Sequence, residues 1–264
     1  MGKVFFVATP IGNLGDFSYR AVQTLNDADV ILCEDTRHSR VLLDRYGIKK
    51  PLKAYHKFNE AKTSDAVCDM AEEGKNVAVI SDAGMPCISD PGYLLVRKLI
   101  ERGIDYTVIP GPCAFVNAFV MSGFEAPFTF VGFLKEKQSE FKKQLENLPS
   151  TCLIFYSSVH NVNDDLKKLY AELGNRRVCV VREISKMFEE VLFFDLKDAQ
   201  IENPKGEFVL IVDAVKEQST LNSLSVEEHV NFYVKNGLTK MEAIKKTAKD
   251  RGVGKNEIYK FFID

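Results

Sequence analysis

The sequence of 264 residues contains no tryptophan, no C-x-x-C pair and no long hydrophobic run. Its six cysteines are spread along the chain, so neither a zinc cage nor a redox motif is expected, and a reducing cytosol fits them best. A membrane-spanning helix needs about 20 apolar residues, and the N-terminal apolar stretch is too short for a signal peptide. We therefore expect a cytoplasmic protein without a membrane segment. The formal net charge of −2 excludes a uniformly basic nucleic-acid binder, although a locally basic face is compatible with it.

Several common catalytic signatures are missing as well. No G-K-[ST] follows a glycine-rich turn and no G-x-G-x-x-G is present, so a Walker A loop and the usual Rossmann dinucleotide site lose their main support. A hydrolase triad is unsupported because the G-x-S-x-G elbow is absent. None of the four histidines pairs with another at i, i+4, and we expect no metal site.

Short apolar runs that alternate with amphipathic stretches are present instead. The predicted strands are 3–9, 29–33, 76–81, 105–109, 152–156, 177–181 and 207–213. The predicted helices are 18–27, 36–46, 59–73, 90–102, 114–122, 138–147 and 160–173. Such alternation predicts an α/β protein with parallel sheets.

Changes in composition divide the chain. Residues 124–150 are rich in Phe and Lys, and a polar stretch near 218 precedes three further helical patterns. We predict α/β domains over residues 1–116 and 117–217 and a helical extension over 218–264. The extension has a helix–turn–helix pattern, which fits nucleic-acid binding and a small capping bundle equally well.

Permissive loops follow four of the predicted strands, at 7–16, 34–38, 81–92 and 110–114. In open α/β sheets, ligands bind outside the carboxyl ends of the strands. Small residues such as Gly let backbone groups approach a ligand closely. Taken together, the loops predict one shared cleft.

Each loop also has a plainer interpretation as a strand-to-helix turn. Asp16 or Ser18 can cap the helix after the first loop, and Asp35 or Thr36 can cap the helix after the second, with Glu34 paired to an Arg. We expect Asp90 to cap the helix after the third loop.

Basic stretches at 49–57, 135–143 and 245–255 are interleaved with aromatic residues. They fit a surface that attracts and stacks on RNA. Solvated helix faces are the alternative.

Sequence motifs in the four loops resemble a known family. VATPIGNLGD, CEDTRHSRVLL, SDAGMPCISDPGY and IPGPCA are similar, in this order, to the signature loops of the tetrapyrrole methylase superfamily, and within it to the ribosomal RNA small subunit methyltransferase I branch. Weaker similarity continues through FVGFLKEK, CLIFYSSVH, VVREISKMFEE and KGEFVLIV, so it covers about residues 4–213. The resemblance implies two α/β domains with S-adenosylmethionine in the cleft between them. It also implies a homodimer that methylates the 2′-oxygen of a cytidine in small-subunit (16S) ribosomal RNA.

The resemblance carries a set of cofactor residues onto this chain. Asp82 is the acid of the cofactor loop, and Met85 contributes backbone. The small pair Cys113 and Ala114 matches the part of the family site that contacts the methionine moiety. The whole implied set is Pro10, Asp82, Met85, Cys113, Ala114, Tyr156, Ser157 and Ile184.

The acid-rich EDTRH loop faces the substrate in the family. A ribose hydroxyl is a poor nucleophile, and a positioned base accelerates its reaction by about 10²–10⁴-fold. We expect Asp35 or Glu34 to act as this base or to orient the hydroxyl, and Arg37 to hold a phosphate of the RNA.

The sequence departs from the family pattern in two places. Met85 stands where the family usually has Thr, and residues 156–161 read YSSVHN where it usually has Tyr-Glu-Ser-Pro-His-Arg. These departures imply altered affinity, a different RNA target or a divergent paralogue. C-methylation of a tetrapyrrole intermediate, an activity of the same superfamily, stays open as an alternative. A non-catalytic RNA-binding module, which only the altered residues 156–161 support, stays open too.

Overall fold

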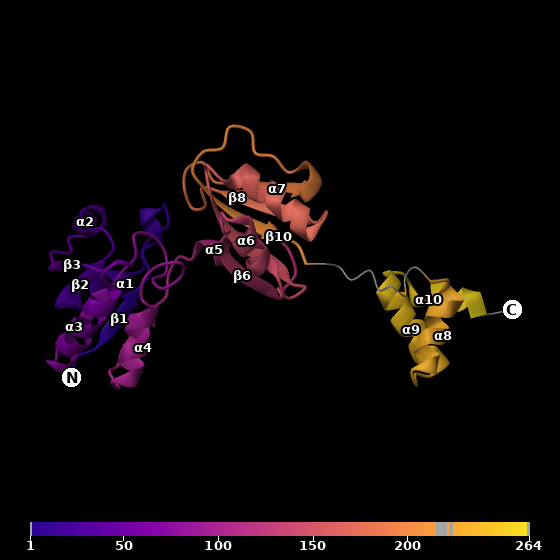
Figure 1. Ribbon diagram of the computed structural model, residues 1–264. Coiled ribbons are helices and arrows are strands. Elements are labelled where there is room, and N and C mark those ends of the chain that lie inside the picture. Colours follow the sequence, from indigo (N-terminus) through magenta and orange to yellow (C-terminus); the bar gives the residue numbers. More distant parts are fainter. Residues whose placement is uncertain (1, 215–220, 222–223, 263–264) are drawn as a thin grey trace. The chain divides into compact units, whose positions relative to one another are not determined.

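The computed structural model describes residues 2–214, 221 and 224–262 (Figure 1). The chain forms two compact units, residues 1–214 and residues 215–264. Within the described ranges, no helix combines the length and the apolar character that crossing a membrane requires.

The first sheet is five-stranded and entirely parallel, in the order β3-β2-β4-β1-β5. Its strands are β1 (Val4–Val7), β2 (Val30–Cys33), β3 (Leu52–Ala54), β4 (Val77–Val79) and β5 (Tyr106–Ile109). The helices that connect or follow them are α1 (Tyr19–Asp27), α2 (Thr36–Arg45), α3 (Glu60–Glu72) and α4 (Tyr93–Glu101). The carboxyl ends of all five strands therefore meet at one edge.

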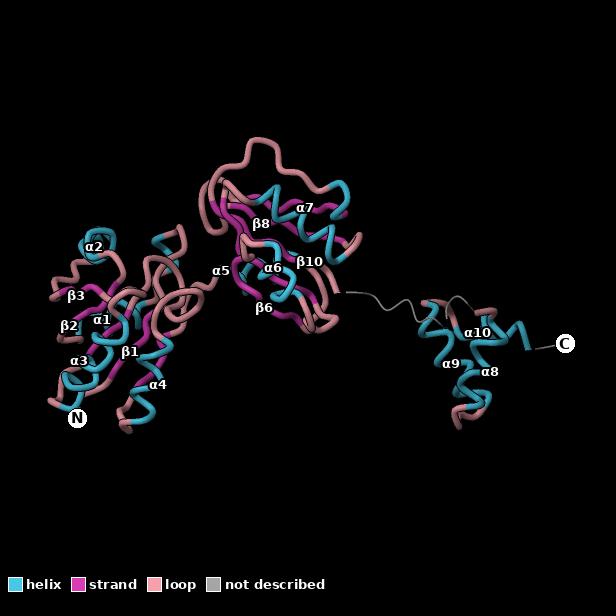
Figure 2. The backbone as a smooth tube through the Cα atoms, viewed as in Figure 1, coloured by secondary structure: helices cyan, strands magenta, loops and turns pink. Residues whose placement is uncertain are grey.

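Helices cover both faces of this sheet (Figure 2). Side chains alternate between the faces of a strand, so Val30 and Leu32 of β2 pack with α3 and α4, whereas Ile31 and Cys33 pack with α1 and α2. Coverage on both sides explains why the strands are short, continuous apolar runs. Of the two expected caps, Asp16 and Ser18, it is Ser18 that caps α1: its side chain accepts a hydrogen bond from the backbone N–H of Ala21.

The second sheet is mixed, in the order β6-β7-β10-β8-β9. Its strands are β6 (Phe128–Phe133), β7 (Cys152–Ser158), β8 (Arg177–Arg182), β9 (Glu190–Asp195) and β10 (Glu207–Val212). Only β6 and β7 pair in parallel, and the other pairs are antiparallel. The prediction of parallel sheets is wrong here, because β8, β9 and β10 follow one another without an α-helix, and parallel neighbours need a long crossover.

Strands β3, β6 and β9 were not among those expected from the sequence. Each lies at an edge of its sheet, where residues are less buried than in central strands. Their sequences LKA, FTFVGF and EVLFFD consequently lack the fully buried pattern of β2 or β4.

Helices also cover both faces of the second sheet. Helix α7 (Val162–Leu173) packs on one face, and α5 (Ala114–Ser122) packs on the other beside Ile154 and Val209. A further helix, α6 (Gln138–Leu145), precedes β7. The predicted domain boundary at 116 thus falls inside α5, and the one at 217 lies outside the described residues. The division into domains stays a prediction.

The C-terminal unit consists of α8 (Val226–Lys235), α9 (Lys240–Arg251) and α10 (Lys255–Tyr259) in its described part. Ser225 and Thr239 begin α8 and α9 with capping boxes. Val230, Ile244 and Ile258 form a buried core of this unit's own.

Candidate functional site

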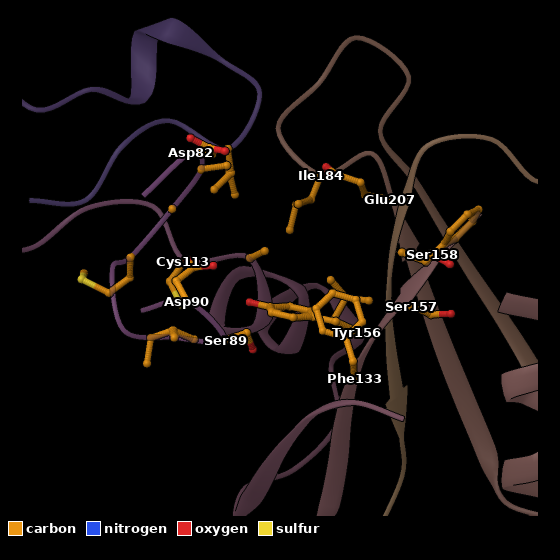
Figure 3. A pocket seen from close by; sticks show the side chains of 18 of the residues that line it. Asp82, Ser89, Asp90, Cys113, Phe133, Tyr156, Ser157, Ser158, Ile184 and Glu207 are labelled. Atoms are coloured by element: carbon orange, nitrogen blue, oxygen red, sulfur yellow. The ribbon is translucent and has the colours of Figure 1, made fainter. Parts of the chain in front are cut away.

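A cavity of about 410 Å³ lies within residues 1–214, between loops of the first sheet and strands of the second (Figure 3). Its volume falls in the range of small-molecule sites, roughly 300–1,000 Å³. Every implied cofactor residue except Pro10 lines it, and Glu34 does so too. The cavity-lining residues that sequence reasoning missed include Ile88, Ser89, Asp90, Phe133, Ser158 and Glu207.

The first and third loops are joined by a short backbone bridge. The Thr9 N–H donates to the Gly84 carbonyl at 2.9 Å, and the Gly84 N–H donates back at 3.1 Å. Gly84 has a φ of 80°, and a Cβ there would lie 3.2 Å from Cγ2 of Ile11. A glycine at this position therefore allows the two loops to approach closely.

Pro10 lines a second cavity, of about 530 Å³, together with His38, Leu42 and Arg45. Asp82 lines both cavities, so the two meet at this residue. The structure thus places Pro10 beside the first cavity and not within it.

The two acids of the EDTRH loop have different environments. Oδ1 of Asp35 accepts hydrogen bonds from the backbone N–H groups of Arg37, at 2.8 Å, and His38, at 3.4 Å, and its carboxylate pairs with the Arg37 guanidinium. These bonds, that from the Arg37 backbone above all, lower the pKa of Asp35. Asp35 therefore caps α2, as the plainer interpretation expected, and neither Asp35 nor Arg37 lines the first cavity or the second.

Glu34 is half-buried and lines the first cavity. Burial raises the pKa of its carboxyl, and the nearby Asp82 raises it further. The side chain of Asp82 in turn accepts a hydrogen bond from the backbone N–H of Asp35 at 3.4 Å, which ties the second loop to the third.

Asp90 does not cap α4, so that prediction is wrong. The helix begins after Gly92, and Oε1 of Glu60 accepts from the backbone N–H groups of Gly92 at 2.8 Å and Leu94 at 3.2 Å. A carboxylate from α3 has taken the capping role, which leaves Asp90 free to line the cavity. Burial, with Glu34 and Asp82 nearby, raises the pKa of Asp90 to about 7.

Tyr156 points from β7 across the cavity toward Cys113 and Asp90 (Figure 3). It also packs against Phe130 and Phe133, with ring centroids 5.0 and 5.5 Å away. Burial raises the pKa of Tyr156 to about 12, so its hydroxyl stays protonated at neutral pH. This wall of the cavity is aromatic.

The Ser157 hydroxyl is engaged outside the cavity. It donates to Oδ2 of Asp165 in α7 at 2.6 Å, and both residues are buried. Burial raises the pKa of Asp165, and the Ser157 hydrogen bond opposes this effect. Ser157 is one of the residues that depart from the family pattern, and its side chain bonds β7 to α7.

The segment after β8 brings Ile184 to the cavity and reaches the opening loop of the chain. Ser185 donates a hydrogen bond to Asp16, and the Lys186 stem lies so close to Gly12 that a Cβ there would be 2.3 Å from Cγ of Lys186. These contacts connect the two halves of residues 1–214 beside the cavity.

No three His, Cys, Asp or Glu side chains in the described part of the chain are arranged to hold a metal ion.

Comparison with known proteins identifies relatives of this chain. Residues 3–200 match the family described as Tetrapyrrole (Corrin/Porphyrin) Methylases. The chain is 41% identical over 273 residues to a ribosomal RNA small subunit methyltransferase I of Halalkalibacterium halodurans, covering 99% of this chain and 94% of that protein. It is 45% identical to the protein of the same name from Mycoplasmopsis pulmonis, covering 80% of this chain and 97% of that protein. The crystal structure of the methyltransferase CobJ shares the fold, with a TM-score of 0.63 at 20% identity, over 82% of this chain and 95% of that one.

Proposed function

The chain belongs to the tetrapyrrole methylase family, and we propose that it transfers a methyl group from S-adenosylmethionine to the 2′-oxygen of a cytidine in small-subunit ribosomal RNA. The observation that carries this proposal is one cavity lined by the motif loops of the first sheet and the strand ends of the second. Relatives that match nearly the whole chain are named as ribosomal RNA methyltransferases, which supports RNA as the acceptor.

The chemistry of the cavity fits the proposed cofactor. Its apolar and aromatic lining, which includes Ile184, Val209 and Tyr156, suits a nucleoside. The carboxyl groups of Asp82 and Asp90 suit a ligand that carries positive charge. We assign cofactor binding to Asp82, Met85, Cys113, Ala114, Tyr156 and Ile184, with Ser157 contributing through its backbone and Pro10 at the border with the second cavity.

When bound, S-adenosylmethionine supplies a methyl group that is activated by the positive charge of its sulfur. The protein has to align the acceptor oxygen with this methyl group and exclude water. Glu34 is the better placed of the two expected bases, because it lines the cavity and burial raises its pKa, whereas the pKa of Asp35 is lowered. Asp35 then positions the loop by capping α2.

The second cavity supports the acceptor side of the proposal. Leu14 and Leu42 give it apolar walls that suit a base or a ribose, and His38 and Arg45 add polar groups. Because Asp82 lines both cavities, an acceptor in the second can meet a donor in the first. Arg37 is highly exposed next to this cavity's residue His38 and is our candidate for holding an RNA phosphate.

Two finer points belong to the same proposal. Following the family resemblance, we propose that the protein is a homodimer, which light scattering of the purified protein tests. A ribosomal substrate would place it in the cytoplasm.

Methyl transfer to isolated small ribosomal subunits tests the function. The subunits come from a strain in which the gene has been deleted, the donor carries a radiolabelled methyl group, and ribose methylation is mapped afterwards. We expect label at the 2′-oxygen of one cytidine. Intact cofactor binding with no transfer to RNA would refute the proposed acceptor and favour a tetrapyrrole, and transfer to a tetrapyrrole precursor would establish that alternative.

A further inference from the structure

The first cavity has an unbalanced charge. Glu34, Asp82, Asp90 and Glu207 line it, and no Lys, Arg or His among the described residues does so. Glu207 pairs with Lys186, whose Nζ lies 2.8 Å from Oε2 of Glu207 and 2.8 Å from Oε1 of Glu183. The other three form no ion pair within the described residues; Asp82 is exposed, whereas Glu34 and Asp90 are half-buried. Burying an ionised group without a partner is costly, and such a group keeps a proton more readily.

Asp90 is the carboxyl group of the three with the least local support. Glu34 also makes no side-chain hydrogen bond within the described residues, but the nearby His56 acts to lower its pKa, whereas both charged neighbours of Asp90 are acids. Asp82 accepts a hydrogen bond from the backbone N–H of Asp35. Within the described residues, the Asp90 side chain makes neither a hydrogen bond nor an ion pair, although it is half-buried. Its backbone is held in place nonetheless, because Glu60 binds the N–H of Gly92 two residues later.

We propose that Asp90 holds a proton in the free protein and releases it when the positively charged sulfur of the cofactor enters the cavity. This inference rests on the proposed function, since it takes S-adenosylmethionine as the ligand. It assigns to Asp90 a role in recognising the charge of the cofactor.

Burial and the two charged groups that face Asp90 all act in the same direction in the free protein. Glu34, at the end of β2, and Asp82, after β4, are acids whose charges disfavour ionisation of Asp90. Cys87 and Tyr156 are its other titratable neighbours, and both stay neutral at pH 7 because burial raises the pKa of the thiol to about 11 and that of the phenol to about 12. The pKa of Asp90, about 7, is consistent with a carboxyl group that is partly protonated near neutral pH.

A cation in the cavity reverses this balance. Charges interact over several ångströms where water is excluded, and a space of about 410 Å³ is small enough that any cation inside it acts on all three carboxyl groups. The ionised form of Asp90 becomes the stable one, and a proton leaves. By linkage, binding of the cation then tightens as pH rises toward the pKa of the free protein.

The product of methyl transfer provides a matched ligand control. S-adenosylhomocysteine has a neutral sulfur but otherwise the same groups, so it fills the cavity without bringing the charge. Proton release is therefore expected with S-adenosylmethionine and not with S-adenosylhomocysteine.

Titration calorimetry at pH 6.5 in three buffers of different ionisation enthalpy counts the protons released. This pH lies below the titration of an α-amino group, near 7.7–8.0, so the ligand's own amine contributes little. We expect wild-type protein to release about half a proton with S-adenosylmethionine and close to none with S-adenosylhomocysteine. Asp90→Asn should release clearly fewer protons with S-adenosylmethionine than the wild type does, and close to none with S-adenosylhomocysteine. Asp27→Asn, an exposed change at the end of α1, should behave as wild type.

Three results would overturn the inference. One is binding of S-adenosylmethionine to the wild type with no dependence on buffer, and another is unchanged proton release by Asp90→Asn. The third, no binding of either ligand to the wild type, rejects the proposed function together with the inference. The first two leave the proposed function intact, so the failures can be told apart.

A second measurement needs no variant and covers the case in which Asp90→Asn fails to fold. The affinity of the wild type for each ligand is followed between pH 5.5 and 7. We expect the affinity for S-adenosylmethionine to rise severalfold with pH over this range, while that for S-adenosylhomocysteine stays flat. Parallel curves for the two ligands would overturn the inference.

Discussion

Oε1 of Glu60 lies 2.8 Å from the backbone nitrogen of Gly92, so a side chain of α3 caps the N-terminus of α4. The same oxygen accepts from the backbone N–H of Leu94 and from the Tyr55 hydroxyl, each at 3.2 Å. Gly92 has a φ of 141°, and a Cβ there would lie 2.2 Å from Sγ of Cys87, so the loop is tightly constrained at this end. Glu60 thereby fixes the loop that carries Asp82 and Asp90.

Replacing Glu60 should affect both stability and the site. Glu60→Ala leaves backbone donors at the start of α4 without their partner, which costs about 1–3 kcal/mol for a buried group. We expect urea denaturation to show a loss of this size and calorimetry to show weaker cofactor binding. Glu73→Ala, at the other end of α3, breaks an exposed pair with Lys75 and should change neither. Equal changes in stability and in cofactor affinity for the two variants would contradict the role of Glu60.

At the Ser157–Asp165 pair we expect a variant that loses stability but keeps its cofactor affinity. Ser157→Ala removes the hydrogen bond to a buried carboxyl group, and we expect a loss of about 1–3 kcal/mol in the free energy of unfolding. Cofactor affinity should stay within about twofold, because the hydroxyl is turned away from the cavity. Ser158→Ala serves as the control, with little loss of stability. A large drop in affinity for Ser157→Ala alone would show that its hydroxyl contacts the ligand.

The raised pKa of Asp90 predicts how stability depends on pH. The unfolded chain ionises this residue near its reference pKa of about 3.9, whereas the folded protein does so at about 7. The contribution of Asp90 to stability is therefore fully present below about pH 4 and is lost as pH rises to 7.

Asp90→Asn has no such titration. Thermal or urea unfolding should show the variant gaining stability relative to the wild type between pH 5 and pH 8. Asp27→Asn should show a constant difference across this range. A stability difference for Asp90→Asn that does not change with pH would contradict the assignment.

The contrast between Glu34 and Asp35 makes a kinetic prediction. Glu34→Gln removes the carboxylate that lines the cavity, and we expect kcat for methyl transfer to fall by about 10²–10⁴-fold. Asp35→Ala removes the cap of α2, so it should lower stability modestly and leave cofactor affinity unchanged. Single-turnover rates with small ribosomal subunits compare the two variants. A larger rate loss for Asp35→Ala would identify Asp35 as the base.

The C-terminal unit is predicted to be dispensable for cofactor binding. Both cavities lie within residues 1–214, and α8 to α10 form their own core. The relative from Mycoplasmopsis pulmonis matches 80% of this chain over 97% of its own length, so a fifth of this chain has no match in that relative. A chain that ends at residue 214 should bind S-adenosylmethionine with wild-type affinity by calorimetry. Loss of binding by a folded truncated chain would show that the C-terminal unit completes the site.

The sequence predicted the motif loops well because their signals are local. Continuous apolar runs such as VILC indicated central strands, and small residues after them indicated permissive turns. The cavity accordingly contains Glu34 and nearly all the residues implied by resemblance.

Distant contacts explain what the sequence did not predict. Asp90 followed by Pro91 has the local pattern of a helix cap, but the capping role belongs to Glu60, whose side chain accepts from Gly92, 32 residues later in the chain. The Ser157 hydroxyl has a partner in α7, which no local pattern indicates. The edge strand β9 and the antiparallel pairing of β8 depend on how strands come together.

Nucleoside mass spectrometry of small-subunit ribosomal RNA from a deletion strain that carries either the wild-type gene or its Glu34→Gln variant is the most direct single measurement. If the chain methylates RNA through the cavity that Glu34 lines, the deletion lacks one 2′-O-methylcytidine, the wild-type gene restores it and the variant does not. An unchanged content of 2′-O-methylcytidine in the deletion strain would contradict the proposed function.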